Sequence, residues 1–180
     1  MRIAQLTENL MAGDAISDNV LALHAALRQG GFEPLLFAAH DRLHPAGIPV
    51  GRAGDMEREL RPSDLLLYQY SIGSPLTDWF LQQRCRKAIV YQNITPAEYL
   101  EPYNAALADA ARMGREKLAA MVDKVDFAFA SSEYSAAELR ALGYGDVTVL
   151  PILLDFERCG IAADEALTKR LRDGKKNILI

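Results

Sequence analysis

The sequence is poor in the features that mark metal-binding, exported and membrane-spanning proteins. Its two cysteines, Cys85 and Cys159, stand far apart with no Cys-x-x-Cys or Cys/His spacing, so neither a zinc site nor a disulfide framework is expected. The longest hydrophobic runs, such as 65–68, are far shorter than the ~20 residues that cross a bilayer. The start of the chain has no pattern of a secretory signal. We therefore expect a cytoplasmic protein.

Neither sign of charge dominates the chain. Its 20 lysines and arginines and 24 aspartates and glutamates give a net charge of −4, which disfavours a general electrostatic grip on nucleic acid or anionic lipid. The motifs G-x-G-x-x-G and G-x-x-x-x-G-K-[ST] are also absent. Nicotinamide-dependent dehydrogenases and P-loop enzymes thus lose support, and no nucleic-acid partner, metal or resident cofactor is expected.

Short apolar runs alternate with longer segments of helical period, the pattern of a βαβ protein with a parallel sheet. The stretch 39–52 is predicted to be a loop, and Gly114 is expected to divide the helical region 97–122. The expected fold is α/β, a doubly wound, mostly parallel sheet with helices on both faces, hence Rossmann-like. Strands are predicted over 2–7, 33–38, 64–70, 87–91, 126–130 and 147–150, and helices over 16–29, 56–60, 76–84, 97–122, 132–142 and 164–172.

Several polar residues fit ordinary structural roles. Thr95 with Glu98, and Ser135 with Glu138, have the spacing of capping boxes. Asp14 precedes a predicted helix, where an aspartate is as well explained by N-capping as by ligand binding. The remaining structural candidates are Asn93 as a turn former, Ser131 and Ser132 as helix caps, and Tyr68 and Tyr91 as buried rings with a solvent-facing hydroxyl.

Polar and aromatic residues gather just after three of the predicted strands. Gly13 stands in the first strand-to-helix turn, and the segments 68–75 and 91–96 read Tyr-Gln-Tyr-Ser-Ile-Gly-Ser-Pro and Tyr-Gln-Asn-Ile-Thr-Pro. Ligands of parallel α/β sheets bind beyond the carboxyl ends of the strands. A glycine next to a helix N-terminus also lets the backbone approach a phosphate closely. This edge of the sheet is therefore the candidate site.

These segments together resemble family 4 glycosyltransferases, which have the GT-B fold. The resemblance is carried by the combination and order of four segments rather than by any single motif, and it spans nearly the whole chain. The segments are Gly-Asp-Ala-Ile-Ser at 13–17, Tyr-x-Tyr-Ser-Ile-Gly-Ser-Pro at 68–75, Tyr-x-Asn-Ile-Thr-Pro-Ala-Glu-Tyr at 91–99, and Ser-Ser-Glu-Tyr-Ser at 131–135 followed by Glu138-Leu139.

The resemblance covers only the N-terminal half of such an enzyme. It implies an acceptor-binding, Rossmann-like domain at 1–156, and a linker with the start of a missing C-terminal, donor-binding domain at 157–180. It further implies a retaining transfer from a nucleotide-sugar, with GDP-mannose as the expected donor. The implied acceptor is a glycan or lipid-linked saccharide of bacterial surface polysaccharide synthesis. Most of the donor site would lie in the missing half, so the chain alone is predicted to be inactive.

The resemblance also assigns residues to the site. Gly13 would approach the donor phosphate or the reacting sugar, with Asp14 and Ser17 nearby. At the positions of two family histidines this sequence has Gln69 and Gln92. A glutamine can hydrogen-bond a sugar hydroxyl but cannot titrate near neutral pH, so Gln92 is a catalytic candidate without a proton-transfer role. The other implied substrate-binding residues are Tyr70, Ser71, Asn93 and Thr95.

Two other interpretations remain open. One is a non-catalytic Rossmann-like module that binds a sugar or a phosphorylated metabolite and acts through a partner, which the two glutamines favour. The other is a one-domain enzyme of a different class on a flavodoxin-like sheet. The charged stretch 112–124 is best explained as a solvated helix face. Some relatives rest a basic amphipathic helix on a membrane, so a peripheral contact at the inner face of the membrane is a further hypothesis.

Overall fold

The computed structural model describes residues 1–153 and 162–172. The predicted domain boundary after residue 156, and residues 157–161 and 173–180 of the predicted linker and domain start, lie outside the described residues. The predicted helix over 164–172 is present as α8 (Glu165–Leu171), which begins at an N-cap where Asp164 accepts a hydrogen bond from the Leu167 amide.

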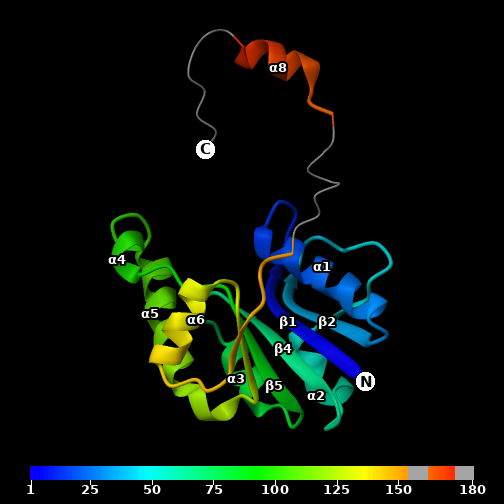
Figure 1. Ribbon diagram of the computed structural model, residues 1–180, viewed down its shortest axis with the longest axis vertical. Helices are drawn as coiled ribbons and strands as arrows, with labels where there is room; N and C mark the ends of the chain where they lie inside the picture. Colours follow the sequence, from blue (N-terminus) through cyan, green and yellow to red (C-terminus); the bar gives the residue numbers. More distant parts are fainter. Residues whose placement is uncertain (154–161, 173–180) are drawn as a thin grey trace.

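A seven-stranded, entirely parallel sheet forms the centre of the protein (Figure 1). The strands run in the order β3-β2-β1-β4-β5-β6-β7, so the direction of winding reverses between β1 and β4. The predicted doubly wound, Rossmann-like architecture is confirmed. The strands are β1 (Arg2–Leu10), β2 (Glu33–Asp41), β3 (Val50–Arg52), β4 (Leu65–Tyr70), β5 (Arg86–Tyr91), β6 (Phe127–Ala130) and β7 (Val147–Val149).

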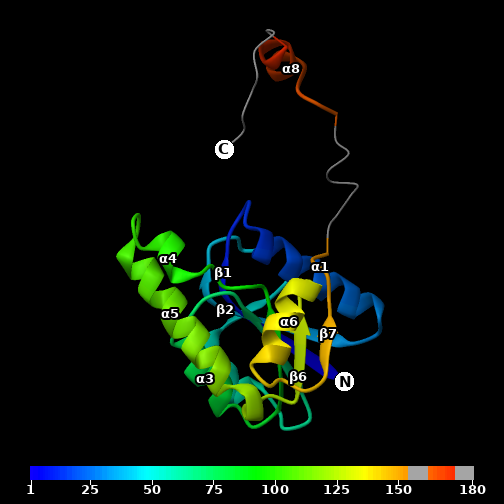
Figure 2. The same ribbon diagram turned by 60° about the vertical axis from the view of Figure 1, so that its left-hand side comes forward.

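The helices cover the two faces of the sheet unequally. The helix α1 (Ala15–Gln29) packs Leu23 and Leu27 against Ile3 and Leu67 on one face. The opposite face carries the larger apolar cluster, to which most of the other helices contribute (Figures 1 and 2). Those elements are a 3₁₀ turn η1 (Ala53–Asp55), α2 (Met56–Glu59), α3 (Leu76–Gln82), α4 (Ala97–Leu100), α5 (Ala105–Ala120), a 3₁₀ turn η2 (Val122–Lys124) and α6 (Glu133–Ala141).

The predicted break at Gly114 is wrong. The helical region divides instead at residues 101–104, where the Asn104 side chain caps α5 by accepting a hydrogen bond from the Leu107 amide at 3.0 Å. Gly114 lies inside α5 because it meets Gly73, and a Cβ atom added to Gly114 would lie 2.6 Å from the Gly73 nitrogen. The glycine therefore serves a close contact between helix and loop rather than a helix end.

Both predicted capping boxes are also wrong. The N-cap of α4 is Pro96, and no side chain caps this helix, so Thr95 is exposed without that role. The helix α6 starts at Ser132, whose hydroxyl accepts a hydrogen bond from the Ser135 amide at 3.2 Å. Glu138 does not turn back to the helix start, because its carboxylate binds side chains from β5 and α5.

The stretch predicted to be a loop contains the edge strand β3. Its pairing with β2 places Phe37 opposite Gly51, and a Cβ atom added to Gly51 would lie 2.6 Å from the Phe37 ring. The strands β1 and β2 are also longer than predicted because they continue to pair as far as Leu10 and Asp41. The extensions bring charged residues of both strands to the carboxyl edge of the sheet.

Candidate functional site

The candidate site is the carboxyl edge of the sheet at the point where the winding reverses. Helices on either side of the β1–β4 junction leave the sheet in opposite directions, which opens a crevice beyond the strand ends. The end of β4 is held next to the segment after β5, because the Gln92 amide donates to the Tyr70 carbonyl at 2.9 Å. Residues from the ends of β4 and β5 therefore meet here.

Three glutamines form a hydrogen-bonded chain across this junction. Gln92 Nε2 donates to Gln69 Oε1 at 2.9 Å, and Gln69 Nε2 lies 3.3 Å from Gln5 Oε1. The chain ends where Gln5 Nε2 donates to the carbonyl oxygen of Val20 in α1 at 3.1 Å. Gln5 and Gln69 are buried, and Gln92 is half-buried at the outer end.

The anchor of this chain fixes the orientation of every amide in it. The Val20 carbonyl can only accept a hydrogen bond, so Gln5 must present its nitrogen to it and its oxygen to Gln69. The same logic orients Gln69 and then Gln92. The Oε1 atom of Gln92 and one N–H of its amide are therefore not used in the bonds between the three glutamines, and they can bind another group. A fixed acceptor beside a fixed donor suits a hydroxyl, which both donates and accepts.

The turn between β1 and α1 is held by side chains within it. Gly13 is exposed and has a φ of +75°, a conformation that favours glycine. Asp14 is the predicted N-cap, and its Oδ2 accepts hydrogen bonds from the Ser17 amide at 2.8 Å and the Ser17 hydroxyl at 2.6 Å. Ser17 is buried and also accepts from the Met11 amide. Gly13 thus leaves the backbone of this turn open to the approach of a ligand.

The rings of Tyr68 and Tyr91 are buried as predicted, but their hydroxyls do not face solvent. The Tyr91 hydroxyl donates to Glu138 at 2.7 Å, and the Tyr68 hydroxyl lies 3.4 Å from Ser74 Oγ. Tyr70 is buried as well and donates to the Gly114 carbonyl at 2.7 Å. Burial raises the pKa of all three phenols, and the Glu138 carboxylate raises that of Tyr91 further.

The other predicted site residues follow β4 and β5. Ser71 is half-buried immediately beyond β4. Asn93 has a φ of +71°, and its Oδ1 accepts a hydrogen bond from the Ile94 amide at 2.8 Å, so it forms the predicted turn. Arg115 of α5 stabilises this turn. It donates a hydrogen bond to the Ile94 carbonyl at 2.6 Å and forms an ion pair with Glu138. The substrate-binding roles of these residues stay a prediction.

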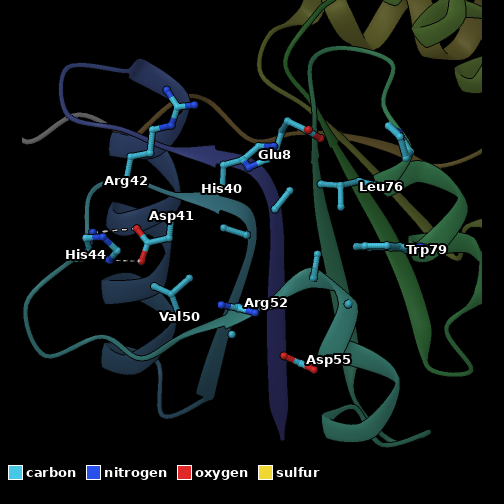
Figure 3. Close-up of a pocket in the computed structure, with 16 residues that line it drawn as sticks. Glu8, His40, Asp41, Arg42, His44, Val50, Arg52, Asp55, Leu76 and Trp79 are labelled. Atoms are coloured by element: carbon cyan, nitrogen blue, oxygen red, sulfur yellow. Dashed lines mark hydrogen bonds and ion pairs between the residues drawn. The ribbon is translucent and has the colours of Figure 1, made fainter.

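A pocket of about 1100 Å³ at the same edge of the sheet was not predicted from the sequence. One wall comes from the ends of β2 and β3, the other from η1 and the start of α3, and Glu8 of β1 lies between them (Figure 3). None of the predicted site residues lines it. The available signal was the unusual density of histidine and arginine in 39–52. The polar and aromatic lining comprises Glu8, His40, Asp41, Arg42, His44, Arg52, Asp55 and Trp79.

Among the charged side chains of the pocket, Asp41 and His44 interact with each other, whereas Glu8, Arg42, Arg52 and Asp55 have no side-chain partner in the described residues. Asp41 is engaged with His44, whose ring nitrogen lies 3.1 Å away, and with two backbone amides. Within residues 1–153 and 162–172, no group of three histidines, cysteines or carboxylates could hold a metal ion.

No helix in the described part of the chain is long and apolar enough to span a membrane.

Comparison with known protein families and with curated proteins finds no match to the sequence. Solved structures of alpha-glucosyltransferases are similar in fold, each with a TM-score of 0.52. One, in complex with UDP and a 13-mer DNA, is 14% identical and is matched over 88% of this chain and 44% of its own. A second, with UDP-glucose and DNA containing an abasic site, is 12% identical over 91% and 46%. A third, with UDP, is 10% identical over 88% and 45%.

The chain therefore spans less than half the length of these glucosyltransferases. At such low identity the likeness establishes the fold alone, which is the Rossmann-like half of a GT-B structure. The finer resemblance to family 4 stays a prediction.

Proposed function

We propose that this chain is the acceptor-binding half of a retaining, nucleotide-sugar-dependent glycosyltransferase. The observation that carries the proposal is the oriented glutamine chain at the winding reversal of a GT-B-like half, where Gln92 offers an acceptor and a donor to a sugar hydroxyl. We further propose, from the sequence resemblance, that the acceptor is a glycan or lipid-linked saccharide and that GDP-mannose is the first donor to test.

The side chains at the junction suit positioning rather than proton transfer. Gln5, Gln69 and Gln92 cannot titrate, and the nearby phenols have raised pKa values, so none of these groups is a base near neutral pH. A transfer in which the departing diphosphate of the donor accepts the acceptor proton requires no base from this half. Gln92 would hold the transferred sugar by its hydroxyls, and the exposed Gly13 would let the diphosphate approach the backbone.

We propose that a second domain binds the nucleotide of the donor. The comparison structures are more than twice as long as the matched region, and this chain has no P-loop motif. Stabilising a departing diphosphate demands preorganised donors or cations, and neither the three glutamines nor the Gly13 turn supplies a basic side chain. We therefore propose that the chain alone folds and binds saccharide but does not turn over.

The test compares the 180-residue chain with the whole gene product. Each is incubated with GDP-mannose or UDP-glucose and a panel of lipid-linked and free glycans, and nucleotide release and the anomeric configuration of the product are measured. We expect release only from the whole protein, with a product of retained configuration. Release by the chain alone, or an inverted product, would contradict the proposal.

Gln69 and Gln92 also favour a second candidate function, a non-catalytic saccharide-binding module. They stand where the family 4 enzymes that this sequence resembles have histidines, which can titrate. Saccharide binding by the whole gene product without nucleotide release from any donor would support this module over the transferase.

A further inference from the structure

The pocket beside the junction holds charged side chains that have no partner in the protein. Four of them, Glu8, Arg42, Arg52 and Asp55, make no side-chain hydrogen bond and no ion pair with any residue of the described ranges. Charged groups around a pocket are normally paired or solvated, and a buried polar atom without a partner calls for a physical explanation. Here one atom of the set, Glu8 Oε2, is buried and unpartnered.

The free charges are balanced in sign. Two carboxylates can accept hydrogen bonds in the pocket, and two guanidinium groups can donate them, while Asp41 is already engaged with His44. A ligand with a net charge of either sign would be attracted by one pair of these groups and repelled by the other. A neutral ligand with many hydroxyl groups can satisfy both kinds of group, because each hydroxyl donates one hydrogen bond and accepts others.

The pocket also has an aromatic wall. Trp79 is 43% exposed although it is a large aromatic residue, and it extends from α3 into the pocket opposite β2 and β3 (Figure 3). Its ring lies 3.7 Å from the place that a Cβ atom at Gly54 would take, so the glycine leaves this part of the ring uncovered. An exposed indole provides a flat apolar surface, which the C–H face of a pyranose ring can cover.

We propose that this pocket binds an uncharged hexopyranose unit of the acceptor saccharide. Glu8 accepts hydrogen bonds from ring hydroxyls, Arg42 and Arg52 donate to hydroxyl oxygens, and Trp79 stacks on the apolar face of the sugar. The inference rests on the proposed acceptor-binding function and adds to it a place and a chemical class. The pocket and Gln92 both lie at the carboxyl edge of the sheet, while Glu8 and Gln5, three residues apart in β1, face opposite sides of it.

Trp79 makes the test direct because it is the only tryptophan in the chain. The purified 180-residue protein is titrated with methyl α-mannopyranoside and methyl α-glucopyranoside, and with glucuronate and mannose 6-phosphate as anionic counterparts. We expect a saturable change of tryptophan fluorescence with at least one neutral glycoside. The anionic sugars should bind no more tightly than the neutral glycosides, since repulsion from Glu8 and Asp55 offsets their attraction to Arg42 and Arg52.

Variants then locate the ligand. Glu8→Gln keeps the shape of the side chain but removes its charge, and it should weaken binding of the neutral glycoside by about tenfold. The matched control, Glu33→Gln, alters an exposed glutamate at the other end of the neighbouring strand β2 and should leave the affinity unchanged. By calorimetry, Trp79→Ala should abolish measurable binding and Trp79→Phe should restore part of it. Thermal unfolding checks that each variant is folded.

The outcomes separate this inference from the proposed function. Neutral glycosides that bind without changing the fluorescence, or that are unaffected by Glu8→Gln, would overturn the assignment to this pocket. Stronger binding of the anionic sugars would overturn the chemical class. No binding of any sugar would overturn the pocket as a saccharide site. The proposed function is judged independently by nucleotide release from the whole gene product, in which Glu8→Gln should raise the KM for the acceptor and leave the KM for the donor unchanged.

Discussion

The two ends of strand β1 differ in whether their charged side chains have partners within the protein. At the amino end, Arg2 pairs with the buried Asp64 through Nε at 3.1 Å and Nη2 at 2.5 Å, and the Arg61 amide also donates to this carboxylate. At the carboxyl end, Glu8 has a buried oxygen with no partner. The same strand thus begins in a satisfied structural network and ends in an unsatisfied pocket. Charges that stabilise the fold have partners in it, whereas charges available for a ligand have none.

The largest effect on stability is expected from Asp64→Asn. This change removes the negative partner of Arg2 at a buried site, and breaking such a pair costs about 3–5 kcal/mol of unfolding free energy. Urea denaturation monitored by circular dichroism measures the loss. Asp55→Asn, at a free carboxylate of the pocket, is the matched control and should change the unfolding free energy by no more than ~0.5 kcal/mol. Equal losses in the two variants would remove the contrast.

A somewhat smaller loss is expected from Gln69→Leu, which interrupts the glutamine chain in its middle. It leaves Gln5 Oε1 without its donor, and an unsatisfied buried polar group costs about 1–3 kcal/mol. It also frees Gln92 to rotate, so sugar transfer by the whole protein should fall as well. Denaturation and nucleotide release are measured together. An unchanged unfolding free energy would show that the hydrogen bonds between the three glutamines do not stabilise the junction of β1 and β4.

The pH dependence of stability should follow the amino end of β1. Burial tends to raise the pKa of Asp64, but the hydrogen bonds and charge of Arg2 and the Arg61 amide outweigh it, so the folded-state pKa lies below the ordinary value of 3.8. The unfolded state then binds the proton more readily. The stabilisation is present above pH 3.8 and is lost as the pH falls through the folded-state pKa. The stability advantage of the wild type over Asp64→Asn should accordingly shrink on acidification, as measured by denaturation at a series of pH values.

The smallest effect on stability is expected from Glu8→Gln. Because Glu8 has no partner, neutralising it should leave the unfolding free energy within ~0.5 kcal/mol of the wild type, on the side of greater stability. Saccharide binding should nevertheless weaken. A loss of more than ~1 kcal/mol in urea denaturation would show that Glu8 has a structural partner after all, and the two ends of β1 would no longer differ.

The apolar runs predicted the central strands and the edge strand β7, whereas the other edge strand, β3, was missed. The apolar runs before Tyr70 and Tyr91 identify β4 and β5, since a central parallel strand that is covered on both faces is mostly apolar. The edge strand β3 has only three residues and exists through its pairing with β2. Local spacing also failed for the capping boxes, because Glu138 is drawn to Tyr91 and Arg115 from other elements.

The candidate site divides in the same way. Alternation of strands and helices places the segments after β1, β4 and β5 at one edge, so the sequence alone locates Gly13, Gln69 and Gln92 there. It does not identify Gln5, which looks like any strand residue until β4 lies beside it. Glu8 and Trp79 are also inconspicuous in the sequence, and they line one pocket only because β1 and α3 meet at the same edge.

The sequence by itself therefore determined the class of fold and the edge that carries the candidate site, because both follow from the periodicity of apolar residues. Tertiary structure decided which polar groups are satisfied and which are left free for a ligand. That distinction depends on partners far apart in the chain, such as Arg2 with Asp64 and Gln5 with Gln69. Hydrogen bonding acts over about 3 Å in space, whatever the separation in sequence, so only the folded chain reveals it.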